Sequence, residues 1–273
     1  GHYCESEYEY AFIGFLEAEG WKYSSGNNIH RVTKRDVLIA DDFKKFIADT
    51  NPDLTEDEVI QIYDNVRLVG AESDFATLHK VYGWMVNGVQ FTTQDGLPRM
   101  IPLIDFDNWD KNIFRVVNQF TVEYTNNGQK ENRRPDVLLF VNGMPLCVVE
   151  LKNPVDANAT IYDAWEQINI RYWRDIPHLL HYCPLACISD GVKTRLGTVR
   201  TPYEHFYAWR RVNEGDVVST LPFAETETMI KGVYTPERFV EIFRDYIYFQ
   251  DSIYDSDEVE IICRYPQFFA AKL

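Results

Sequence analysis

The sequence has no long apolar run, no even set of cysteines and no excess of positive charge. No stretch approaches the roughly 18–20 consecutive apolar residues that cross a bilayer, so we expect no membrane partner. The cysteines number 5, and no cluster of cysteine and histidine residues marks a zinc site. Cys147 and Cys187 lie in apolar runs, where a free cysteine behaves as a small apolar side chain. We therefore expect a reduced, cytoplasmic protein.

The net charge of −15 disfavours a free-standing nucleic-acid-binding protein, which is usually basic because phosphate contacts supply most of its affinity. Two segments are locally basic. Residues 193–211 balance to +5 − 1 = +4, and residues 130–134 carry three basic residues against one acidic residue. The basic residues are Lys193, Arg195, Arg200, Arg210 and Arg211 in the first segment and Lys130, Arg133 and Arg134 in the second. From charge alone, ordinary solvated loops are the favoured interpretation of these two segments. The alternatives are that they contact DNA locally, or that DNA is held by other domains or subunits.

The 273 residues, 45% hydrophobic and 15% aromatic, suffice for one large or two small globular domains. The first two residues, Gly1 and His2, resemble what remains after removal of an affinity tag, and we leave them out of the fold prediction. Apolar spacing and capping residues predict helices over 5–19, from 41 onward, over 55–66, 160–173 and 237–249. Alternation and turn signals predict strands over 114–124, 137–141, 146–151 and 185–188, with short strands in 195–231.

Three charged residues interrupt two of the predicted strands. Asp136 begins the strand 137–141, and Glu150 and Lys152 lie at the end of the strand 146–151. The pair Asn142-Gly143 between the strands is a strong hairpin signal, and this hairpin brings Asp136 close to Glu150. Glu150 and Lys152 are two residues apart, so both side chains point to one face. Burying such groups beside an apolar sheet is costly unless they are paired or bind metal.

This arrangement predicts a divalent metal site. Asp136, Glu150 and the backbone carbonyl of Leu151 offer oxygen ligands for Mg²⁺, with Mn²⁺ as a substitute. A metal there would activate water and stabilise charge on a phosphodiester, and Lys152 would position water or neutralise the transition state. The alternative is a surface hairpin with an Asp–Lys or Glu–Lys cross-strand pair. The motif by itself favours neither the metal site nor the surface hairpin.

The segment Arg134 to Lys152 resembles the N-terminal nuclease region of the restriction (R) subunit of type I restriction-modification enzymes. Asp136, Glu150 and Lys152 fall on that family's PD-(D/E)xK signature. Residues 103–108 and 118–122 resemble its lead-in to the hairpin. The resemblance also implies an additional acidic metal contact on the first helix, which Glu9 would supply, with Glu5 or Glu7 as alternatives. A solvated helix position is the other interpretation of Glu9.

Residues 164–177 resemble the family's Q-x-x-x-Y helix, with one departure. Four residues separate Gln167 from Tyr172, one more than the usual spacing. Either the helix bulges or another residue takes the place of the tyrosine. The resemblance assigns Gln167 a contact with phosphate or with Lys152, and gives Tyr172 a catalytic role or, as the alternative, core packing with Trp173.

Residues 264–270 resemble the segment that opens the ATPase motor in this family, where Gln267 would contact the adenine of ATP in the full-length protein. No G-x-x-x-x-G-K-[ST] phosphate loop occurs in the sequence. We therefore expect two parts: residues 1–250, an endonuclease domain with an N-terminal helical region, and residues 251–273, a connection to an ATPase motor that this chain lacks.

Together these observations predict an α/β (α+β) restriction-endonuclease-like fold, with a mixed central sheet flanked by helices and additional N-terminal helices. The predicted reaction is Mg²⁺-dependent hydrolysis of double-stranded DNA within an ATP-dependent type I restriction enzyme. The resemblance implies methyltransferase (M) and specificity (S) subunits as partners. The alternatives are a catalytically silent docking or DNA-contacting module, and a repair or junction nuclease of the same fold.

Overall fold

The computed structural model describes residues 5–70, 72–153, 155, 158–250 and 259–272. Its centre is a six-stranded sheet in the order β1-β4-β7-β8-β9-β10. The strands are β1 (Lys22–Ser25), β4 (Phe114–Asn118), β7 (Val137–Val141), β8 (Met144–Leu151), β9 (Leu185–Ser189) and β10 (Thr194–Thr198). The pairs β1–β4 and β8–β9 are parallel, and the other neighbours are antiparallel. This mixed sheet confirms the predicted fold class.

Helices cover both faces of the sheet. Helix α1 (Glu5–Ala18) packs near β1, β4 and β8 and beside α8 (Ala224–Val233), whereas the continuous helical stretch of α5 (Ile161–Glu166), η3 (Gln167–Tyr172) and α6 (Trp173–Asp175) approaches β8 and β9. Ser189 bonds to Tyr8 of α1, while Glu150, in register with the neighbouring residue Ile188, reaches η3. Because successive side chains of a strand alternate between faces, α1 and η3 lie on opposite sides of the sheet.

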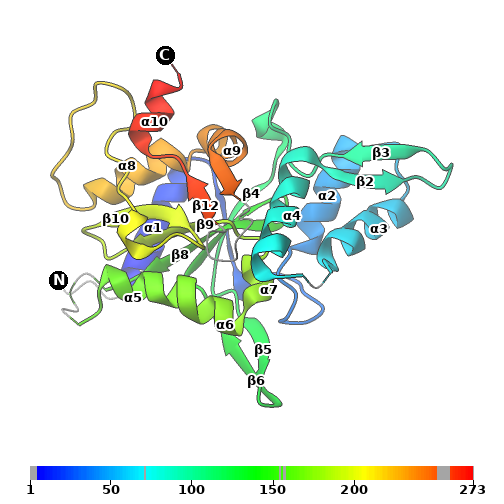
Figure 1. Cartoon of the computed structure of the whole chain (residues 1–273), viewed down its shortest axis with the longest axis horizontal. Helices are drawn as coiled ribbons and strands as arrows, with labels where there is room; N and C mark the ends of the chain where they lie inside the picture. The colour runs from blue at the N-terminus through cyan, green and yellow to red at the C-terminus, as the bar shows by residue number, and fades with distance from the viewer. Residues whose placement is uncertain (1–4, 71, 154, 156–157, 251–258, 273) are drawn as a thin grey trace.

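The remaining elements surround this centre. In Figure 1, helices α2, α3 and α4 and the hairpin β2–β3 lie together on the right of the sheet, and the hairpin β5–β6 extends away from the body below it. These elements are α2 (Ala40–Thr50), α3 (Glu56–Arg67), α4 (Asp74–Asn87), β2 (Val89–Thr92), β3 (Pro98–Ile101), β5 (Val122–Asn126) and β6 (Gln129–Arg133). The others are η1 (Gly26–Asn28), η2 (Trp109–Lys111), α7 (Pro177–Leu180), η4 (Tyr203–His205), α9 (Pro236–Asp245), β11 (Ile247–Gln250), β12 (Val259–Ile262) and α10 (Tyr265–Ala270).

The turn between β7 and β8 is the predicted Asn-Gly turn. Asn142 and Gly143 both have positive φ, 51° and 78°, as a two-residue hairpin turn with matching twist requires. A Cβ on Gly143 would lie 2.2 Å from the carbonyl oxygen of Ile39, so the backbone leading into α2 approaches too closely for any other residue. The buried Asn142 side chain is fully engaged, since it accepts from the amide of Ile113 and donates to Leu103 and Asn112. The hairpin is therefore fixed against the N-terminal helical region.

Three secondary-structure predictions were wrong in part. The single strand predicted over 114–124 is two strands, β4 and β5, because Gln119 takes a positive φ of 55° and turns the chain out of the central sheet. The region 195–231 holds only β10, a short 3₁₀ helix and α8 among its regular elements, because buried residues of α8 pack it against α1 and β10. The helix predicted over 237–249 ends at Asp245, and β11 follows.

The C-terminal segment packs against the rest of the described chain. Strand β12 pairs with β11, and Phe268 of α10 is buried with its ring 5.5 Å from that of Trp209. Residues 251–258, where the predicted connection begins, lie outside the described residues. The division at residue 250 therefore stays a prediction. Among the described residues no helix is long and apolar enough to cross a membrane.

Candidate functional site

The β7–β8 hairpin brings Asp136 and Glu150 together at one end of the sheet. Val137 pairs with Val149, so the preceding Asp136 lies beside Glu150, as the sequence predicted. The backbone amide of Asp136 approaches Glu150 Oε1 at 3.4 Å, and the amide of Leu151 donates to Asp136 Oδ2 at 2.7 Å. Glu150 is fully buried, and its second oxygen, Oε2, has no hydrogen-bond partner among the described residues.

Lys152 joins these carboxylates through a chain of hydrogen bonds. Its Nζ donates to Gln167 Oε1 at 3.0 Å, and Gln167 Nε2 donates to the hydroxyl of Tyr172 at 2.9 Å. That hydroxyl donates in turn to Glu150 Oε1 at 2.5 Å. Four of the predicted site residues thus form one connected network, and Tyr172 is a member of it as well as a buried core residue.

The unusual spacing between Gln167 and Tyr172 has a structural explanation. Residues 167–172 form a π-helix, η3, inserted between α5 and α6. A π-turn holds one residue more than an α-turn, so Tyr172 at i+5 lies on the same face as Gln167. Of the two alternatives left by the sequence, the bulged helix is the one observed.

Burial sets the charge properties of the two carboxyl groups. It raises the pKa of Asp136, although the amide of Leu151 acts to lower it. Burial and the neighbouring charge of Asp136 raise the pKa of Glu150 well above its ordinary value. Burial and the charge of Glu150 raise the pKa of Tyr172, which keeps its hydroxyl neutral and able to donate. The surrounding side chains therefore do not supply enough positive charge to offset the cost of ionising both carboxyl groups.

Glu9 approaches the site from α1. Its Oε1 accepts from Asn118 Nδ2 at 2.7 Å, and Asn118 in turn accepts from the hydroxyl of Tyr23 at 2.8 Å. Burial raises the pKa of Glu9, and the charge of Asp136 raises it further. Nevertheless, no three His, Cys, Asp or Glu side chains of the described residues are grouped as a metal site. Glu5, one alternative to Glu9, has no described side chain, and Glu7 is exposed.

The donor set fits a hard divalent cation. Two neighbouring carboxylates with raised pKa values, Glu150 fully buried with an unpartnered oxygen and Asp136 partly buried, are stabilised when a cation balances their charge. Asp136, Glu150 and the backbone carbonyl of Leu151 are the ligands that the sequence suggested, with Glu9 nearby. Lys152 is held by Gln167, which bonds through Tyr172 to Glu150, so its ammonium group belongs to the same network.

Two further residues bear on the sequence predictions. Gln267 lies in α10, where its Oε1 accepts from the backbone amide of Arg264 and thus caps the helix. Asn118, which holds Glu9 in place, was missed by the sequence analysis as a site residue. A polar residue at the end of an apolar strand was its only signal, and its role depends on α1, which is over a hundred residues away.

Comparison with known proteins gives a consistent result. The family model for the type I restriction enzyme R protein N terminus matches residues 3–205. A putative type I restriction enzyme MjaIXP endonuclease subunit of Methanocaldococcus jannaschii is 30% identical, over 97% of this chain and 27% of the relative. The type I restriction enzyme HindI endonuclease subunit of Haemophilus influenzae is 30% identical, over 97% of this chain and 26% of the relative. The chain thus spans about a quarter of the length of these relatives.

Proposed function

The chain belongs to the family of type I restriction enzyme R protein N termini, and from that premise we propose that it is a metal-dependent endonuclease domain that hydrolyses phosphodiester bonds of double-stranded DNA. Its relatives are named as endonuclease subunits, which supports a general role in restriction. The finer assignment, to a PD-(D/E)xK site with Mg²⁺ or Mn²⁺, rests on the geometry of the site.

One observation carries the proposal. Glu150 is completely buried with an unpartnered oxygen beside Asp136, at a cost that a bound cation would offset. A purely structural hairpin would have no reason to keep two carboxylates there. The alternative cross-strand ion pair is absent: among the described residues Lys152 makes no ion pair within 4.0 Å and instead bonds to Gln167.

Each residue of the network has a role in this proposal. Asp136, Glu150 and the Leu151 carbonyl would hold the metal, which when bound supplies Lewis-acid stabilisation and an activated water. Lys152 stabilises negative charge on the phosphate oxygens as the water oxygen bonds to phosphorus and the bond to the leaving oxygen breaks. Gln167 fixes the Lys152 ammonium, and Tyr172 orients Glu150 through its hydroxyl.

The activity of the whole subunit is also part of the proposal. We expect cleavage in the full-length protein to depend on ATP, bound by a motor domain outside this chain, with Gln267 near the adenine. Methyltransferase (M) and specificity (S) subunits are the expected partners. For the 273-residue chain alone we expect weak or no site-specific cutting, and robust cutting at defined sequences without those subunits would contradict this.

Calorimetric titration of the 273-residue chain with MnCl₂ and MgCl₂ tests the metal assignment. We expect saturable binding that is lost in Asp136→Asn, because the variant removes one of the two charges that hold the cation. Asp110→Asn, an exposed acidic residue in η2, is the matched control and should bind as the unaltered chain does. Equal binding by all three proteins would overturn the assignment.

A second function is favoured by two observations. The chain has a net charge of −15, and its described residues contain no group of three metal-binding side chains. Both agree with a silent nuclease-fold module that docks partners or contacts DNA. Such a module has no need for metal, so the same titration separates the two functions.

A further inference from the structure

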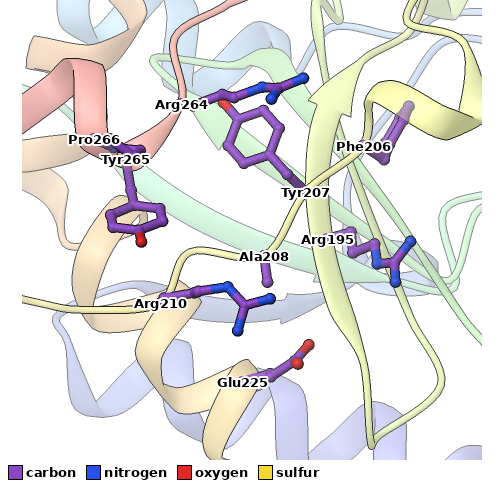
Figure 2. A pocket seen from close by; sticks show the side chains of 9 residues that line it. All are labelled: Arg195, Phe206, Tyr207, Ala208, Arg210, Glu225, Arg264, Tyr265 and Pro266. Carbon is purple, nitrogen blue, oxygen red and sulfur yellow. The ribbon is translucent and has the colours of Figure 1, made fainter. Parts of the chain in front are cut away.

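A second polar site lies beside β10, the edge strand of the sheet. It is a pocket of about 390 Å³, and four separate parts of the chain line it. The lining residues are Arg195 of β10, Phe206, Tyr207, Ala208 and Arg210 of the following loop, Glu225 of α8, and Arg264, Tyr265 and Pro266 at the start of α10. Figure 2 shows the three arginine side chains entering from three of these parts.

The pocket is cationic in a strongly acidic protein. Its charged residues balance to +3 − 1 = +2, whereas the whole chain carries −15. Among the described residues no carboxylate pairs with Arg195, Arg210 or Arg264, whereas the exposed Arg67, for example, pairs with Asp64 at 3.1 Å. The one carboxylate present, that of Glu225, accepts from the backbone amide of Thr194 at 2.9 Å. Three unpaired guanidinium groups repel one another, and a bound anion would relieve that repulsion.

The aromatic residues restrict the anion. The Arg264 guanidinium lies 5.7 Å from the centre of the Tyr207 ring, and the rings of Tyr207 and Tyr265 are only partly buried. One guanidinium group can bind two phosphate oxygens at once, and aromatic rings stack on nucleic-acid bases or sugars. The combination therefore fits a phosphate ester that carries bases better than a simple inorganic anion.

The pocket lies on the same end of the sheet as the candidate nuclease site. Glu150 is in register with Ile188, and Ile188 is in register with Arg195, so the three form one row across β8, β9 and β10. Strands are spaced about 4.8 Å apart, so the Cα atoms of Glu150 and Arg195 are roughly 10 Å apart. Exposed Lys193 lies on the turn between β9 and β10. A DNA strand carries one phosphate per ~3.4 Å of its axis, so this span covers about three phosphates.

We propose that Arg195, Arg210 and Arg264 bind backbone phosphates of the DNA that is cut at Asp136 and Glu150. The pocket rests on the nuclease function proposed above and extends it by naming the residues that hold the substrate. It also gives a role to part of the basic segment 193–211, whose function the sequence left open. The pocket thus brings together three arginines without a carboxylate partner in a strongly acidic chain.

Fluorescence anisotropy of a labelled 30-base-pair duplex tests the proposal with the 273-residue chain in EDTA, between 50 and 200 mM salt. We expect Arg210→Gln to weaken binding roughly tenfold at the lowest salt and to reduce the slope of log affinity against log salt by about 0.9, the loss of one phosphate contact. Arg195→Gln should lower the affinity and the slope by similar amounts, and this change on β10 leaves the start of α10 unaltered. Arg67→Gln is the control, since its guanidinium already has a carboxylate partner, and should change neither quantity.

Three results would overturn the pocket. The first is unaltered affinity and salt slope in both Arg195→Gln and Arg210→Gln, and the second is no measurable binding of DNA by the unaltered chain at 50 mM salt. The third is binding of free ATP that Arg210→Gln abolishes while DNA affinity persists, which would assign the pocket to a free nucleotide. If the arginine variants lose DNA but metal titration shows no site at Asp136, the nuclease proposal fails and the DNA-binding pocket stands.

Discussion

The metal-site end of β7–β8 and the arginine pocket beside β10 use charge in opposite ways. At the first, Glu150 is buried and Asp136 partly buried, and a chain of hydrogen bonds through Tyr172 fixes the position of Glu150. At the second, Arg195 and Arg210 line an open pocket and have no acidic partner among the described residues. We propose that the first arrangement binds a small cation and the second a larger anion.

This difference in local charge shows how a chain with a net negative charge can act on DNA. Net charge describes the field far from the protein, which at −15 repels a polyanion. Within about 8–10 Å, at physiological salt, only local charges act on a phosphate. Most other arginines of the described chain sit beside a carboxylate, as Arg115 does with Asp42 and Arg133 with Asp175. Arg195, Arg210 and Arg264 have no such partner and line one pocket together, where a phosphate can reach them.

Among changes that keep both carboxylates in place, Tyr172→Phe is expected to have the largest effect on metal affinity. The change removes the hydroxyl that donates to Glu150 and accepts from Gln167, so Glu150 loses its orientation. We expect Mn²⁺ affinity to fall about 10–100-fold in calorimetry, as when a hydrogen-bond partner of a metal ligand is removed. DNA affinity in EDTA should not change.

Tyr182→Phe provides the matched control for that experiment. Tyr182 is also buried, but its hydroxyl donates to the carbonyl of Val66 and takes no part in the hydrogen-bond network of Glu150. It should lose stability and keep its Mn²⁺ affinity. A fall of equal size in both variants would mean that Tyr172 acts through packing alone.

A smaller effect, on stability, is expected for Glu150→Gln without metal. Burial and Asp136 raise the pKa of Glu150 in the folded state, so folding favours the protonated form. Stability of the unaltered chain therefore falls as pH rises from its unfolded pKa near 4.5 through the raised folded pKa, and the penalty is complete above that value. The neutral variant avoids it, and we expect its melting temperature at pH 7.5 to be higher by about 2 °C or more.

The pH dependence supplies the control. At pH 4 and below, Glu150 is protonated in both folded and unfolded states, so the two proteins should melt within about 1 °C of each other. Addition of Mn²⁺ at pH 7.5 should stabilise the unaltered chain and not the variant. A variant that is less stable at pH 7.5 would show that the hydrogen bonds of the Glu150 carboxylate outweigh the cost of burying its charge.

Local patterns were enough to predict the centre of the site. Two apolar runs joined by Asn142-Gly143 predict the hairpin and bring Asp136 near residues 149–150, and a register shift between Leu139 and Phe140 then sets it beside Glu150. The extra residue before Tyr172 was visible as a spacing, but only packing against β8 decides that the helix forms a π-turn instead of rotating the tyrosine away.

Features that depend on distant segments were not predictable. The Gln119 backbone conformation that separates β5 from β4 follows from tertiary packing, because alternation continues through it in the sequence. The parallel pairing of β8 with β9 and the burial of α8 likewise join separated segments. The arginine pocket combines Arg195 with Arg264, and no local pattern relates residues so far apart.

The smallest effect is expected for Lys130→Gln on the hairpin β5–β6. Lys130 belongs to the second basic segment of the sequence, but it is highly exposed and lies 3.1 Å from Glu123. Its charge is already matched, so we expect DNA affinity to change less than about twofold in the anisotropy assay. A loss as large as that of Arg210→Gln would place this hairpin, too, in contact with DNA.

We propose that Asp136, Glu150 and Lys152 form a cleavage site separate from the motor. Its most direct test is Lys152→Ala in the full-length subunit assembled with its partner subunits, with DNA cutting and ATP hydrolysis followed in the same sample. We expect cutting to fall by about 10²-fold or more, since a charge acting on the transition state is lost, while ATP hydrolysis continues. Cutting at the unaltered rate would show that Lys152 is structural and that the nuclease site lies elsewhere.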